Sequence, residues 1–353
     1  MTDYQNQQYP EDLRLGVISS IELTDQRFRR AEFLIDGFLK PGLAILAGSP
    51  KIGKSWMVLQ LCLSVSKGET FWGMDTKEST VLYIDLEDSE QRMQERIVRS
   101  TEEASDNLKI TFSCSQLGEG IADEIRNFVQ EYPDASLVVI DTFQKIRMPL
   151  GQTSYAVDYA EISHLKRVAD ELNICILLVH HTRKMGDSDC MNEISGTNGI
   201  AGSADTLMVL KKPKRTDRKA ELYCTGRDIE DRSLELLFDR ETCRWKVTKD
   251  SNQQQVVSLP ECIIELREYM KTVRQYQGSN TLFCDGFAAF WGQPIKASTL
   301  KREMNRWRYE LEDMGVCFKS YRTNKERLLI IKYAEEHDEL VKTVASAYDR
   351  YDR

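Results

Sequence analysis

The amino-acid sequence predicts an α/β fold in two parts. The first is a mostly parallel sheet with helices on both faces and an antiparallel extension, and the second is a small winged-helix-like α+β domain. Short, continuously apolar segments alternate with helical periodicity through the first half, which is typical of parallel strands covered on both faces. Hairpin-linked strand segments follow. Beyond a polar stretch, the pattern changes to three helices and a hairpin.

The strands of the first part are marked by their apolar runs. Segment 42–47 (GLAILA) follows a Pro-Gly turn and begins the sheet. The further expected strands are 80–85, 110–113, 137–141, 174–180, 205–210, 220–225, 234–238 and 243–247. Helical patterns occur at 56–67, 89–99, 124–132 and 155–172. Four of these strands are separated by helices and therefore belong to a parallel sheet, which the later strands extend as hairpins.

We expect four segments along the chain: a polar lead-in over 1–30, the sheet domain over 31–247, a linker over 248–258 and the winged-helix-like domain with a charged tail over 259–353. The linker begins with the unpatterned polar stretch TKDSNQQQ. In the last segment the expected elements are an amphipathic helix at 261–276, an aromatic-rich helix at 282–291, a helix from Ser298 through Met314, and strands at 316–321 and 328–333.

Composition limits the classes of protein that fit. The chain has 353 residues and a formal net charge of −8, which excludes a uniformly basic nucleic-acid coat and leaves only local patches for DNA contact. Its nine cysteines form no C-x-x-C pair, which favours reduced thiols. No run reaches 18 apolar residues, and the N-terminus lacks the apolar core of a signal peptide. We therefore expect a cytoplasmic protein without membrane contact.

A phosphate-binding loop follows the first strand. Gly48–Ser55 reads GSPKIGKS, with a helical pattern after it, so the G-x-x-x-x-G-K-S spacing stands between strand and helix. Glycine allows a backbone path that points N–H groups at phosphate oxygens. Lys54 is expected on the β- and γ-phosphates, and Ser55 on Mg²⁺. The expected nucleotide-binding residues are Gly48, Ser49, Pro50, Lys51, Ile52, Gly53, Lys54, Ser55 and Trp56.

Two carboxylates follow later strands. Asp141 ends the strand LVVID and is a candidate for the Mg²⁺ shell, although an aspartate there also starts turns. Glu87, in YIDLED, is a candidate for the general base that activates water. A surface acidic loop is the alternative interpretation, and Asp88 is the competing base. We expect a structural role for Asp85.

Polar residues after the fourth strand form a second group of candidates. His180 and His181 close that strand, and His181 is the better candidate for sensing the γ-phosphate. Arg183 and Lys184 lie on the glycine-containing loop that follows and are candidates for gripping a DNA backbone, unless the loop is merely solvated. Arg227, after the strand ELYCT, is a candidate arginine finger for a neighbouring site.

Basic residues also gather in two other places. The stretch 211–219 (KKPKRTDRK) is a basic patch or a simple hairpin tip. One C-terminal helix carries Trp307 and four basic residues, namely Lys301, Arg302, Arg306 and Arg308. This helix is either a DNA-recognition helix or a solvated face, since glutamates dilute its charge.

Together these motifs resemble the RecA-like ATPases of the hexameric replicative helicase type, particularly the plasmid RepA branch. The resemblance covers about residues 30–247. It rests on GSPKIGKS and on the five later segments YIDLED, LVVIDT, LLVHHTRK, SGTNGIAGSADTLMVL and TGRDIED. It implies a RecA-like P-loop NTPase core that assembles into a ring, with nucleotide sites between subunits and DNA through the centre.

By matching position, the resemblance implies that Lys54 and Ser55 hold phosphates and Mg²⁺, and that Glu87 is the catalytic base. It likewise implies Asp141 as the Mg²⁺-shell carboxylate and His181 as the γ-phosphate sensor. Arg227 matches the family's arginine finger least well. The winged-helix-like segment is not part of the minimal family unit, which leaves helicase, loader and regulatory relatives open.

The sequence therefore predicts an ATP- and Mg²⁺-dependent enzyme. We expect it to couple hydrolysis to binding and movement on single-stranded DNA during replication of a plasmid or mobile element, as a hexameric ring that acts with replication partners. The alternatives are a RecA/RadA-like recombination or repair ATPase that forms filaments, and a nucleotide-gated DNA-binding regulatory module that does not unwind.

Overall fold

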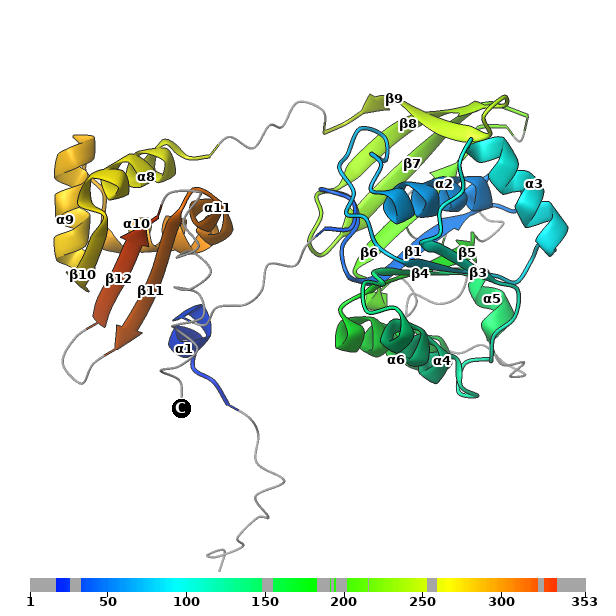
Figure 1. Cartoon of the computed structure of the whole chain (residues 1–353), viewed down its shortest axis with the longest axis horizontal. Helices are drawn as coiled ribbons and strands as arrows, with labels where there is room; N and C mark the ends of the chain where they lie inside the picture. The colour runs from blue at the N-terminus through cyan, green and yellow to red at the C-terminus, as the bar shows by residue number, and fades with distance from the viewer. Residues whose placement is uncertain are drawn as a thin grey trace, which may run out of the picture. The chain divides into compact units, whose positions relative to one another are not determined.

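The computed structural model divides the chain into two compact units (Figure 1). Unit 2 spans Ala31–Val256, and unit 1 combines Met1–Arg30 with Val257–Arg353. The structure describes residues 17–25, 33–147, 155–182, 191, 194, 202–214, 216–252, 259–322 and 327–334. Within these residues, no helix is both long and apolar enough to cross a membrane.

The larger unit is built on one nine-stranded sheet in the order β3-β2-β4-β5-β1-β6-β7-β8-β9. Strands β3, β2, β4, β5, β1 and β6 run parallel, and β7, β8 and β9 continue the sheet as antiparallel hairpins. The strands are β1 (Gly42–Gly48), β2 (Val81–Asp85), β3 (Leu108–Thr111), β4 (Leu137–Asp141), β5 (Cys175–His181), β6 (Thr206–Lys211), β7 (Lys219–Gly226), β8 (Arg232–Asp239) and β9 (Arg244–Asp250). The predicted fold class, a mostly parallel sheet with an antiparallel extension, is confirmed.

Helices cover both faces of the parallel part (Figure 1). Helices α2 (Lys54–Lys67) and α3 (Glu90–Ser100) lie on one face, and α4 (Ile121–Glu131) and α6 (Tyr155–Leu172) on the other. Alternate residues of β1 supply both cores: Leu46 packs into the α2 core and Ile45 into the α6 core. Every residue of β1, β2 and β4 is buried, which explains why their sequences are continuously apolar. The short helix α5 (Phe143–Ile146) follows β4.

The last strand of the sheet is longer than its apolar pattern indicated. β9 continues to Asp250, and Lys249 and Asp250 pair with β8 although the linker was expected to begin at residue 248. Trp245 of β9 is fully buried and packs into the same core as α2. This strand therefore reaches the nucleotide-loop side of the domain.

The smaller unit combines helices with a three-stranded sheet in the order β10-β12-β11. Its elements are α1 (Ser20–Asp25), α8 (Glu261–Val273), β10 (Gln275–Ser279), α9 (Asn280–Trp291), α10 (Ala297–Arg306), α11 (Arg308–Asp313), β11 (Val316–Arg322) and β12 (Arg327–Tyr333). This is the α+β arrangement expected for a winged-helix-like domain. Buried side chains of α8, α9, α10 and the hairpin form its core.

Two boundaries in this unit differ from the sequence prediction. α8 ends at Val273, because Arg274 takes a left-handed φ of 63°, and the chain then pairs as β10 with β12. The single helix expected from Ser298 to Met314 is broken at Trp307, whose ψ of 30° is not helical. Periodicity missed both changes because tertiary pairing and a single backbone angle decide them.

Candidate functional site

The phosphate-loop sequence connects β1 to α2, as the motif predicts. A Cβ atom on Gly48 would lie 2.6 Å from Ile52 Cδ1 and 2.8 Å from the carbonyl oxygen of Leu210. Gly53 has a φ of 104°, and a Cβ there would lie 2.9 Å from Cζ2 of Trp245. Both positions therefore require glycine, one for close packing and one also for its backbone angle.

Lys54 is held at the mouth of this loop. Its Nζ atom donates hydrogen bonds to the carbonyl oxygens of Gly48 (2.8 Å) and Ser49 (3.1 Å). Burial lowers the pKa of Lys54 to about 8, against the opposing attraction of Asp141 and Glu87. A buried ammonium group with few compensating charges is well suited to receive phosphate oxygens, whose charge would raise its pKa again.

Asp141 lies at the end of β4 beside the first turn of α2. Its carboxylate accepts hydrogen bonds from the Ser55 side chain and from the Tyr83 hydroxyl, the latter at 3.0 Å. Burial raises the pKa of Asp141 to about 6, although both hydrogen bonds oppose that rise. A buried carboxylate bonded to a P-loop serine is a donor set that suits Mg²⁺, which binds oxygen ligands and keeps several waters or phosphate oxygens.

The segment after β2 places Glu87 near Asp141 and Lys54. Asp85 accepts hydrogen bonds from the backbone N–H groups of Glu87 (3.1 Å) and Asp88 (3.0 Å), and so fixes the turn. Asp88 forms ion pairs with Arg92, at 2.8 Å, and Arg96. The Glu87 side chain is 44% exposed and accepts a hydrogen bond from Thr142 at 3.3 Å. Of the two candidate bases, Glu87 is therefore accessible, whereas the carboxylate of Asp88 is buried in its ion pairs.

His181 joins the group from β5. Its Nδ1 atom is 3.5 Å from Lys54 Nζ, and its Nε2 atom is 4.0 Å from Glu87 Oε1. Burial and then the Lys54 charge lower the pKa of His181, while Glu87 and a backbone hydrogen bond with Gly48 raise it. The lowered pKa favours a neutral imidazole between an ammonium and a carboxylate at neutral pH.

Parallel pairing explains why these residues meet. Gly48 of β1 is in register with His181 of β5, and Asp85 of β2 is in register with Asp141 of β4. The carboxyl ends of these four strands therefore lie side by side at one end of the sheet, where ligands of open α/β sheets bind. Lys54, Glu87, Asp141 and His181, separated by up to 127 residues in sequence, are brought together there.

Arg227 lies near the amino ends of the parallel strands, at the end of the sheet opposite the phosphate loop. Its backbone N–H donates to the carbonyl oxygen of Asp205 (2.9 Å), whose own N–H donates to Leu43. Leu43 is five residues from Gly48, which corresponds to about 16 Å along β1 at 3.3 Å per residue. The Arg227 guanidinium, 61% exposed, lies 3.7 Å from the Asp205 carboxylate. It does not approach the phosphate loop of its own chain.

The remaining predicted residues fall in two groups. Trp56 lies between α3 and β8: its ring centroid is 5.3 Å from the Arg96 guanidinium carbon and 6.4 Å from the Phe238 ring centroid. The candidate DNA-contacting residues Arg183 and Lys184 lie outside the described residues. Thr182, directly before them, has its N–H 3.4 Å from the carbonyl oxygen of Gly48, so the start of this loop touches the phosphate loop.

Sequence reasoning missed the support beneath the loop. The Trp245 indole N–H donates to the carbonyl oxygen of Gly53 at 3.1 Å. The Gln60 side-chain amide of α2 pairs with both backbone groups of Trp245, at 3.1 and 2.9 Å. A tryptophan nearly 200 positions from the glycine carries no motif, so its only sequence signal was an apolar residue in an expected strand.

A phosphate loop and convergent carboxylates at the carboxyl ends of the strands of a mostly parallel sheet are the features of a P-loop ATPase. Residues 9–187 match the family described as AAA domain, and this match spans 179 of 353 residues. The chain belongs to this family. The matched region contains Lys54, Glu87, Asp141 and His181 and ends before Arg227.

Many solved structures also match, 396 chains in all. One is "The Structure Of A DnaB-Like Replicative Helicase And Its Interactions With Primase", at 15% identity and a TM-score of 0.48. The alignment covers 58% of this chain and 57% of that chain, so this chain spans a little over half the length of the helicase. No curated protein matches.

Proposed function

We propose that this protein is a Mg²⁺-dependent ATPase that couples ATP hydrolysis to binding and movement on single-stranded DNA, in the replication of a plasmid or mobile element. The observation that carries the proposal is the meeting of Lys54, Glu87, Asp141 and His181 at one strand edge beside the phosphate loop. Membership of the AAA domain family supports the ATPase part. The DNA and replication parts rest on the resemblance of the motifs.

The proposal gives each of these residues a role in hydrolysis. Lys54 neutralises charge on the β- and γ-phosphates, and Ser55 with Asp141 would hold Mg²⁺. When bound, Mg²⁺ supplies charge neutralisation at the phosphate oxygens. Glu87 takes a proton from water as the water oxygen attacks the γ-phosphorus and the bond to the bridging oxygen breaks, releasing ADP and phosphate.

His181 is placed to report this event. It lies within reach of both Lys54 and Glu87, and the next residue, Thr182, contacts the phosphate loop through Gly48 and Ser49. Loss of the γ-phosphate would change the charge that His181 faces, and the change would pass directly into the segment after β5. In this proposal that segment, with Arg183 and Lys184, contacts the DNA backbone.

The proposal includes a ring of identical subunits. Arg227 is too far from its own phosphate loop to take part there, and a head-to-tail ring places one edge of each subunit against the opposite side of the next. In such a ring Arg227 would complete the neighbour's site. Particle mass with a non-hydrolysable ATP analogue tests this part: a closed ring has a fixed mass, whereas a filament grows with protein concentration.

The enzymatic part is tested by steady-state ATP hydrolysis with and without single-stranded DNA. We expect single strands to stimulate turnover, and Lys54→Ala to abolish it. Glu87→Gln should lose turnover but keep nucleotide binding, whereas Glu102→Gln, an exposed acid elsewhere, should behave like the parent. Hydrolysis that ignores DNA would contradict the motor and favour a regulatory ATPase. DNA affinity and activity unchanged by Glu87→Gln would favour a nucleotide-gated binding module.

A further inference from the structure

The smaller unit contains a helix-turn-helix. α9 ends at Trp291, because Gly292 after it has a φ of 76° and its N–H donates to the Ala288 carbonyl oxygen at 2.9 Å. α10 begins at Ala297, five residues after Gly292, and its Leu300 and Met304 pack into the core of the unit. Two helices joined by a short glycine-containing turn form the motif in which the second helix enters a DNA groove.

The outward face of α10 is polar and basic. Ser298, Arg302 and Arg306 are exposed at four-residue intervals, so they form one stripe along the helix opposite Leu300. The Arg302 side chain is 73% exposed, and its guanidinium forms an ion pair with the Glu303 carboxylate at 2.9 Å. Exposed ion pairs of this kind contribute little to stability, so the arginine is readily available to another anion.

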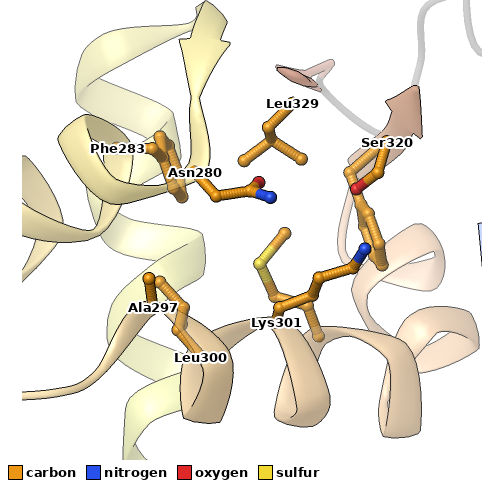
Figure 2. Close-up of a pocket in the computed structure, with 9 residues that line it drawn as sticks. Asn280, Phe283, Ala297, Leu300, Lys301, Ser320 and Leu329 are labelled. Carbon is orange, nitrogen blue, oxygen red and sulfur yellow. The ribbon is translucent and has the colours of Figure 1, made fainter. Parts of the chain in front are cut away.

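Side chains of α10 and of the strands β11 and β12 line one small pocket in this unit. Figure 2 shows Lys301 of α10 reaching toward Ser320 of β11 across a small pocket that Phe283 and Leu329 also line. The pocket has a volume of about 10 Å³, room for no more than a single water, so it is a packing gap between the helix and the strands and not a ligand site. The Arg308 guanidinium carbon lies 4.8 Å from the Phe318 ring centroid on the same strand.

Charge is unevenly distributed along this unit. Segment 296–308, which holds α10, has five basic residues and one acidic residue, and the hairpin stretches 316–320 and 328–333 carry Lys319 and Lys332 and no acidic residue. By contrast, α8 has three acidic and two basic residues. In a chain with a net charge of −8, these seven basic residues against one acidic residue in neighbouring elements make a local anion-binding surface.

We propose that the C-terminal unit binds double-stranded DNA, with the Ser298–Arg302–Arg306 stripe in the major groove and the strands β11 and β12 along the adjacent phosphates. A helix with its side chains is about 10–12 Å wide, which matches a major groove of about 12 Å. Arginine suits guanine edges and phosphates alike. The three stripe residues are not aromatic, and the half-buried Trp307 ring beside them is in contact with the Arg306 guanidinium, whose carbon lies 5.5 Å from the ring centroid. Single-strand binders stack bases on aromatic rings, so this surface favours a duplex.

This function is separate from the single-strand movement proposed above, since it needs neither the phosphate loop nor hydrolysis. It would anchor the ATPase to duplex DNA while the larger unit acts on a single strand. The two proposals therefore fail independently. Lys54→Ala should lose ATP turnover and keep duplex binding, while Arg302→Ala with Arg306→Ala should lose duplex binding and keep turnover stimulated by single strands.

The test is fluorescence anisotropy of the full chain without nucleotide, on a labelled duplex and on a single strand of equal length, over a range of salt concentrations. We expect the Arg302→Ala, Arg306→Ala double variant to bind duplex about tenfold more weakly or worse, with a shallower salt dependence. The matched control is Lys246→Ala with Lys249→Ala, which removes two exposed charges, 63% and 73% exposed, from β9. It should change affinity less than twofold.

Two results would overturn the proposal. One is equal duplex affinity for the parent and both double variants. The other is binding that prefers the single strand and survives loss of Arg302 and Arg306. Because both arginines are exposed, the variants should keep the parent's circular dichroism and thermal transition, so a loss of binding reports the surface itself.

Discussion

Replacing Asp141 by asparagine should stabilise the nucleotide-free fold while removing Mg²⁺-dependent activity. Burial raises the pKa of this carboxyl from 3.8 to about 6, so keeping it ionised at pH 7.5 opposes folding. The shift of about two units corresponds to about 3 kcal/mol at 1.36 kcal/mol per unit, as an upper limit. Asparagine has the same shape and an oxygen that can accept the Tyr83 hydrogen bond, but it carries no charge.

The sign of the pH dependence is fixed by the same shift. Between pH 3.8 and 6 the folded state binds more protons than the unfolded state, so this carboxylate lowers stability progressively as pH rises. At pH 5 the parent should regain about 1.4 kcal/mol of the penalty present at pH 7.5, and Asp141→Asn should regain none.

Urea unfolding of parent and variant at pH 5 and pH 7.5, without Mg²⁺ or nucleotide, measures this directly. We expect the variant to be more stable at pH 7.5 and the gap to shrink at pH 5. A gap that is the same at both pH values, or a variant less stable at pH 7.5, would refute the reasoning. Addition of Mg²⁺ and nucleotide should stabilise the parent strongly and the variant much less.

Three further changes test the site. Trp245→Ala should destabilise the larger unit by about 3–5 kcal/mol through the cavity it leaves, and weaken nucleotide binding because the loop loses its hydrogen bond at Gly53; unfolding and ligand titration measure the two effects. Gly53→Ala should cost about 1–3 kcal/mol in the same unfolding assay, since alanine meets both a φ of 104° and the Trp245 ring. Between pH 7, where Asp141 is ionised, and pH 8, nucleotide affinity should be nearly flat, and it should fall above pH 8 as Lys54 loses its proton, whereas Lys54→Ala should show no such fall in the same titration.

Local patterns predicted most of the larger unit's elements. The buried strands were readable because strands covered on both faces must be continuously apolar, and the phosphate loop was readable because glycine, lysine and serine have distinct geometric duties there. The same reasoning placed Glu87 and Asp141 after strands of one parallel sheet. It could not choose firmly between Glu87 and Asp88, since both follow the same strand.

The contacts of Asp88 show what only the folded chain decides. Arg92 and Arg96 occupy its carboxylate, and this depends on the way α3 packs, which neighbouring sequence does not reveal. In the smaller unit, β10 has an unremarkable sequence, QYQGS, and becomes a strand because β12 offers it a pairing edge. Pairing partners distant in sequence override weak local preference.

By itself the sequence determined the fold class, the nucleotide loop and the strand ends that carry the catalytic candidates, because each depends on residue type and short spacing. The tertiary structure decided the rest. It set the lowered pKa of Lys54 and the raised pKa of Asp141, because burial is a property of packing. It also placed Trp245 under the loop and Arg227 at the far edge, because sheet order and register bring together or separate residues that no local pattern connects.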